Sequence, residues 1–177
     1  MRKRHWTVYA IISIAILSVL YLSFCFWAIR FHLSFENAIT EAGGSVHYHE
    51  KVLPSVTVGS TVTTSVEMTL TDVAISSGSH PLPDELWKLN RIGTVTDLSL
   101  NTNVVSDLVV PKLARLKYIE KLDLTGSEVT GAGVLRLLEE MKGIKTIRFP
   151  AENAAPDEMK RLAPFASSGK LILVGNK

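Results

Sequence analysis

The chain of 177 residues carries 19 lysines and arginines against 17 aspartates and glutamates, a net charge of +2, with a mean hydropathy of +0.21. Four of the basic residues lie in the first 30 positions and every acidic residue follows them, so residues 31–177 carry a net charge of −2. This part of the chain therefore lacks the surplus of basic residues that nucleic-acid binding requires. The single cysteine, Cys25, excludes an intrachain disulfide and a cysteine-based metal site.

The first predicted element is an uncharged segment at residues 6–29, which is 24 residues long. A helix rises about 1.5 Å per residue and needs about 20 apolar residues to cross a bilayer, so this segment predicts a single transmembrane helix. A cleaved signal peptide has a shorter apolar region, of about 7–15 residues, and we therefore expect an uncleaved signal anchor. Arg2, Lys3 and Arg4 precede the span. The positive-inside rule then places the N-terminus in the cytoplasm and the body outside it.

Residues 31–66 are expected to connect the anchor to the main domain. Ser34 is a suitable cap for a short helix with one apolar face, and Gly43-Gly44 would end that helix. Val46 and Tyr48 alternate with histidines, which is typical of a strand, and a second β-branched stretch runs from residue 55 to 66. The apolar face of the predicted helix contains Phe35, Ala38, Ile39 and Ala42.

Two interpretations of the histidines in this region compete. His47 and His49 would share one face of a strand, with Glu50 beside them, so two metal ligands are geometrically possible. His80 is the one histidine downstream that could supply a third ligand. The other interpretation, which we favour, is the polar face of an edge strand.

Residues 67–177 repeat with a period of 24–25 residues. Apolar triplets with the spacing L-x-x-L-x-L recur at offsets of 25, 24, 25 and 24, the last unit being partial. The triplets are Leu70-Val73-Ile75, Val95-Leu98-Leu100, Ile119-Leu122-Leu124 and Ile144-Ile147-Phe149, followed by Ser168, Leu171 and Leu173.

Three further apolar series follow the same period, and within each unit their spacing is helical. Each unit is therefore predicted to contain a short strand and then a helix. Neither can bury its apolar face alone, but stacked units can bury them together. The series are Leu86, Val110, Val134 and Met159; Leu89, Leu113, Leu137 and Leu162; and Ile92, Leu116, Met141 and Phe165.

Residues 122–134 read L-D-L-T-G-S-E-V-T-G-A-G-V and resemble a leucine-rich repeat of the bacterial, ribonuclease-inhibitor-like variety. Residues 98–108 form a weaker copy, with Asn103, Val105, Ser106 and Asp107 in matching places. The copy at residues 147–159 departs more from the pattern, since it has Glu152 and Pro156 at two of these places. The resemblance covers about residues 70–174.

This resemblance implies an α/β leucine-rich-repeat solenoid, with parallel strands on the concave side and helices on the convex side, after one N-terminal transmembrane helix. The expected organisation is residues 1–30 as cytoplasmic tip and anchor, residues 31–66 as connecting region and residues 67–177 as repeat domain. Asn103, Ser127 and Glu152 form a polar column where the chain leaves the sheet, and we expect their side chains to bond backbone groups of the turns.

The expected function is a membrane-anchored module that binds a protein or peptide. The sequence contains no phosphate-loop, nucleophile-elbow, zinc-protease or dinucleotide-binding motif, and we expect no cofactor and no enzymatic activity. The alternatives are an architectural membrane protein without a separate ligand and a metal-dependent factor that uses His47 and His49. The strand residues between the core positions are the candidate partner-binding face: Asp97, Ser99, Lys121, Asp123, Thr146, Arg148 and Lys170, with Ile172 beside them.

Overall fold

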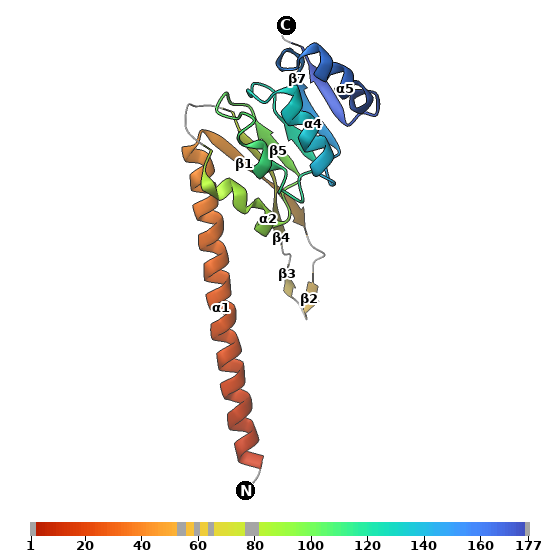
Figure 1. Ribbon diagram of the computed structural model, residues 1–177. Coiled ribbons are helices and arrows are strands. Elements are labelled where there is room, and N and C mark those ends of the chain that lie inside the picture. Colours follow the sequence, from red (N-terminus) through yellow and green to blue (C-terminus); the bar gives the residue numbers. More distant parts are fainter. Residues whose placement is uncertain (1–2, 53–55, 59–60, 64–65, 77–81, 176–177) are drawn as a thin grey trace. The chain divides into compact units, whose positions relative to one another are not determined.

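The structure, a computed structural model, describes residues 3–52, 56–58, 61–63, 66–76 and 82–175 (Figure 1). The chain forms two compact units, Met1–Asn37 and Ala38–Lys177. Helix α1 (Lys3–Glu41) makes up the first unit, and its last residues belong to the second. The second unit holds a mostly parallel sheet and the shorter helices, so the described architecture is mixed α/β.

Helix α1 has 39 residues and is therefore about 58 Å long at a rise of about 1.5 Å per residue. Its segment Ile12–Glu41 contains an 18-residue window with a mean hydropathy of 2.3 and is long and apolar enough to cross a membrane, judged by length and composition. Phe24, Trp27 and Phe31 form a ladder along this helix, with successive ring centroids 6.3 and 5.7 Å apart. Aromatic rings of this kind favour the level of lipid headgroups.

The short helix expected to begin at Ser34 is wrong, because Ser34 lies inside α1, which continues unbroken to Glu41. The apolar residues at helical spacing belong to the same helix as the anchor. No glycine or proline separates them from the span, so nothing in the sequence interrupts the helical hydrogen bonds. The predicted stop is confirmed: Gly43 has φ 76° and donates its N–H to the Thr40 carbonyl at 2.9 Å.

The main sheet has six strands in the order β1-β4-β5-β6-β7-β8, and a separate antiparallel pair, β2 with β3, lies between β1 and β4 in sequence. Strand β1 is antiparallel to β4, and every other neighbouring pair is parallel. The bounds are β1 (Gly44–Val52), β2 (Val56–Val58), β3 (Thr61–Thr63), β4 (Val66–Ile75), β5 (Asp97–Leu100), β6 (Lys121–Asp123), β7 (Thr146–Pro150) and β8 (Leu171–Val174).

The strand register confirms the predicted period. Middle residues of the apolar triplets lie opposite one another on neighbouring parallel strands, at the offsets counted from the sequence. These middle residues are all buried. A fully buried leucine or isoleucine side chain stabilises a fold by about 1.5–3 kcal/mol. The aligned column is Val73, Leu98, Leu122, Ile147 and Leu171.

The first apolar triplet, Leu70-Val73-Ile75, fits the L-x-x-L-x-L spacing through an irregularity in β4. His47 pairs with Asp72 and Tyr48 with Leu70, so Thr71 is an extra residue in the ladder. This bulge turns both Leu70 and Val73 toward the core, although three positions separate them. Strand β1 occupies the edge of the sheet, as the favoured interpretation of its histidines requires.

Short helices follow the parallel strands and lie on one face of the sheet, where α4 and α5 are clearest (Figure 1). The predicted helical series are buried in the middle units, whereas Met159 and Phe165 of α5 are half-buried. Pro111 stands in the first turn of its helix, where a missing N–H is harmless. The helices are η1 (Asp84–Lys88), α2 (Leu89–Ile92), α3 (Val110–Leu113), α4 (Gly131–Glu140), η2 (Ala151–Asn153) and α5 (Pro156–Ser167).

The polar column in the turns differs from the predicted one at two of its three members. Ser127 is buried and accepts the Val129 N–H at 3.4 Å, as expected. Thr102, rather than the exposed Asn103, is buried in the preceding unit and accepts the Val104 N–H at 3.4 Å. In the following unit Glu152 is exposed. Its neighbour Asn153 donates to the carbonyls of Ser127 at 2.7 Å and Val129 at 3.3 Å. The turns differ in shape, so equal sequence spacing does not bring equivalent residues inward.

Candidate functional site

Two rows of side chains cross the sheet on the face opposite the buried columns. Strand pairing sets both rows, because residues that lie opposite each other in neighbouring strands point to the same side. The first row, from β1 to β7, is His47, Asp72, Asp97, Lys121 and Thr146. The second, from β1 to β8, is Ser45, Ala74, Ser99, Asp123, Arg148 and Ile172.

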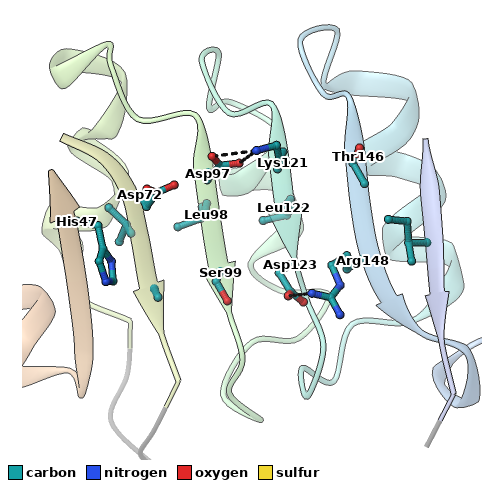
Figure 2. Close-up of a pocket in the computed structure, with 13 residues that line it drawn as sticks. His47, Asp72, Asp97, Leu98, Ser99, Lys121, Leu122, Asp123, Thr146 and Arg148 are labelled. Atoms are coloured by element: carbon teal, nitrogen blue, oxygen red, sulfur yellow. Dashed lines mark hydrogen bonds and ion pairs between the residues drawn. The ribbon is translucent and has the colours of Figure 1, made fainter. Parts of the chain in front are cut away.

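Apart from Ser45, these rows line a groove with a volume of about 540 Å³, which we call the sheet groove (Figure 2). Six of the seven residues predicted for the partner-binding face line it, and so does Ile172. Lys170 does not: it stands one residue before β8, where its N–H bonds the Phe165 carbonyl at 3.0 Å. On the exposed face the structure adds His47, Asp72 and Ala74 to the predicted residues, and the core residues Val73, Leu98 and Leu122 also line the groove.

The sequence contained the signal for two of these additions. Asp72 and Ala74 stand 25 positions before Asp97 and Ser99, so the repeat period extended to the first unit points to them. His47 is different, because it belongs to the antiparallel strand β1, which lies outside the repeat. Only the pairing of β1 with β4 reveals that it reaches the groove.

The best defined contact in the groove is the ion pair of Lys121 with Asp97. The Lys121 Nζ lies 3.1 Å from Asp97 Oδ1 and donates to Oδ2 at 3.2 Å. The hydrogen bond to Asp97, and then its charge, raise the pKa of Lys121 above its ordinary value of 10.5, and Asp72 adds a smaller effect of the same sign. Lys121 is mostly exposed, so solvent screens the pair and limits its contribution to stability.

A second ion pair occupies the other row. Arg148 Nη1 lies 3.4 Å from Asp123 Oδ2, while Asp123 Oδ1 accepts the backbone N–H of Thr125 at 2.9 Å. The side chain of Asp123 is 21% exposed, whereas that of Arg148 is 53% exposed. The carboxylate is therefore fixed by the turn that follows β6, and the guanidinium keeps donors that face solvent.

His47 and His49, the candidate metal ligands, are both exposed residues of β1. His47 pairs with Asp72, but His49 pairs with Thr69, on the other side of the bulge in β4. Within the residues that the structure describes, no three histidine, cysteine, aspartate or glutamate side chains form a group able to hold a metal ion. His80, the third candidate ligand, lies outside the described residues.

The groove can therefore offer fixed carboxylates, two cations and small polar side chains to a ligand that lies across the strands. Comparisons of the chain with known protein families and with curated proteins found no match.

Proposed function

We propose that this chain is a membrane-anchored leucine-rich-repeat protein and that its sheet groove binds a protein or peptide. The repeat assignment is supported by the agreement between the 24–25-residue period and the parallel strand register. The L-x-L-x-x-S-x-V-T segment of the third unit fits it as well, because Ser127 and Val129 are buried in the turn after β6. Stacked strand–turn–helix units of this kind build the rigid, curved surfaces that repeat proteins use for binding.

One observation carries the binding proposal: charged and polar side chains stand in ordered rows along a groove on the open face of the sheet. Six strands spaced about 4.8 Å apart make this face about 24 Å wide, which suits an extended segment of about seven residues. The contact area is modest, so we propose a weak or transient complex whose affinity falls with added salt.

We place the protein among binding modules rather than enzymes, because its groove charges are committed to one another. Lys121 is held on Asp97 and Arg148 on Asp123. Such pairs make a surface of fixed charge pattern, which serves recognition and partner choice. For the anchor, the basic residues before the uncharged segment at residues 6–29 favour a cytoplasmic N-terminus, with the repeat domain on the other side of the membrane.

A charge-reversed ion pair tests the binding proposal. The variant Asp123→Lys with Arg148→Glu keeps an ion pair between β6 and β7 but inverts the charge pattern of the groove. The matched control is Arg136→Glu with Glu140→Arg, which inverts an exposed ion pair on α4, away from the groove. Each anchored variant is crosslinked in the native membrane, purified and analysed by mass spectrometry at a fixed salt concentration.

We expect the groove variant to lose partners that the wild type and the α4 control both retain. Retention of every partner by a folded groove variant contradicts binding through this face. If the crosslinked wild type retains no partner at all, an architectural role without a separate ligand replaces the proposal.

A further inference from the structure

The charges of the sheet groove do not balance, and the surplus lies at one end. Pairing of β4 with β5 sets Asp72 opposite Asp97, so two carboxylates share one row position on adjacent strands. Like charges directly opposite each other in a sheet are destabilising. The groove is lined by three aspartates but only two cations, and the excess is one negative charge.

The ion pairs place this excess on Asp72. Lys121 is engaged by both oxygens of Asp97, and Arg148 by Asp123. The described contact of Asp72 is a hydrogen bond from the neighbouring Thr71 hydroxyl to Oδ2, at 2.9 Å, and among the described residues no cation lies within ion-pair distance of it. Asp72 stands between His47 and Asp97 in the groove (Figure 2).

The adjoining row leaves room for a long side chain beside this carboxylate. Ala74 and Ser99 lie opposite each other on the same two strands, one step along from Asp72 and Asp97. Their small side chains keep the floor of the groove low here, while the apolar stem of an arginine or lysine favours contact with such a surface.

From this charge complementarity we propose that the groove holds an extended peptide segment of a partner protein, and that an arginine or lysine of that segment rests on Asp72. The proposal rests on the binding function proposed above and specifies the chemistry of its ligand. The peptide backbone crosses the strands, and its cation pairs with Asp72, so that Asp72 and Asp97 each have a cationic partner. The fixed charges on β6 and β7 set the direction of the peptide.

Selection from a displayed library of random 12-residue peptides tests this assignment, with the full chain in detergent micelles as bait. We expect the selected peptides to share a basic residue. The affinity of one such peptide is then measured by fluorescence anisotropy against wild type, Asp72→Asn and the control Glu139→Gln, an exposed carboxylate on α4. Asp72→Asn relieves a like-charge contact, so we expect it to fold, and its melting temperature is measured alongside.

Two changes to the contact between Asp72 and the peptide's basic residue should each weaken binding about tenfold: Asp72→Asn in the protein and arginine-to-glutamine in the peptide. Together they should weaken it little further, because both remove the same contact. Asp72→Lys should bind a peptide with glutamate at that position better than the original peptide. Glu139→Gln should bind like the wild type.

Selected peptides that compete for the groove but share no basic residue, or that bind Asp72→Asn as well as wild type, overturn this inference and leave groove binding intact. Peptides that bind equally well to the charge-reversed Asp123→Lys, Arg148→Glu variant, or a library that yields no binder, contradict both proposals. Association of the chain with a second copy that Asp72→Asn abolishes would identify a different occupant and also overturn the inference.

Discussion

Asp107 in the turn after β5 caps the N-terminus of the next unit's helix through Thr130. Its Oδ1 accepts the Thr130 backbone N–H at 2.9 Å, and its Oδ2 accepts the Thr130 hydroxyl at 2.7 Å. Thr130 in turn is the N-cap of α4, since its hydroxyl oxygen accepts the Gly133 N–H at 3.3 Å. A side chain on residue 133 would overlap both Asp107 and Val129, which explains the glycine in that place. One carboxylate thereby links two successive units.

Asp107→Ala should lower the free energy of unfolding by about 1–2 kcal/mol, because it removes a charged acceptor from a helix cap. Asp107→Asn keeps one acceptor and should lose less. Thermal unfolding of the full chain in detergent, followed by circular dichroism, measures both. Equal melting temperatures for wild type and Asp107→Ala would show that the link between the units contributes nothing.

Leu122→Asp should unfold the sheet domain. Leu122 is 1% exposed and lies in the middle of the aligned apolar column, so the new carboxylate would be desolvated without a partner. That penalty is several kcal/mol, comparable with the whole stability of a small domain, about 5–15 kcal/mol. Glu128→Ala, an exposed residue in the adjoining turn, is the control and should melt like the wild type. If Leu122→Asp and Glu128→Ala have the same melting temperature, the strand register is wrong.

The period in the sequence was sufficient to predict the strand columns, since a 24–25-residue offset between apolar residues has few structural solutions other than stacked units. It did not predict the turns. Thr102 replaces Asn103 as the buried residue because the turn after β5 is shaped differently from the turn after β6. Local hydrogen bonding, which is invisible in an apolar pattern, decides such positions.

The candidate site was predicted on the repeat strands and missed at its N-terminal end. Extending the period backward would have found Asp72, but His47 enters the groove through antiparallel pairing between β1 and β4, which no repeat encodes. The same region held the error about Ser34, whose cap preference was outweighed by uninterrupted helical hydrogen bonding from the anchor.

Removal of the Asp97 carboxylate should lower the pKa of Lys121. Because the pKa of Lys121 is raised in the folded chain, the contribution of the ion pair to stability is fully present below pH 10.5. It is lost as the pH rises through the pKa that Lys121 has in the folded chain. In Asp97→Asn this stabilisation is lost. A carbon-13 NMR titration of lysine side chains in wild type and Asp97→Asn measures the shift, with Ser99→Ala as the control. An unchanged pKa in Asp97→Asn would mean that the pair does not form in solution.

A labelling experiment tests the orientation proposed for the anchor. In a Cys25→Ser background, Glu139→Cys places an exposed thiol on α4. Lys3→Cys places the second thiol before the uncharged segment in the sequence. With intact cells, a membrane-impermeant maleimide should label position 139 and not position 3. The reverse pattern would put the sheet domain in the cytoplasm.

Site-specific photo-crosslinking tests the central claim most directly, that the sheet groove is the surface that binds a partner. Benzoylphenylalanine is placed at Ser99, in the groove, or at Arg161, on the exposed side of α5, in the anchored chain within its native membrane. Melting temperatures equal to that of the wild type establish that both variants are folded. We predict a discrete crosslinked product from Ser99, lost in the Asp123→Lys, Arg148→Glu background, and none of that mass from Arg161. A product from Arg161 alone, with none from Ser99, would contradict the account and assign binding to the helical face.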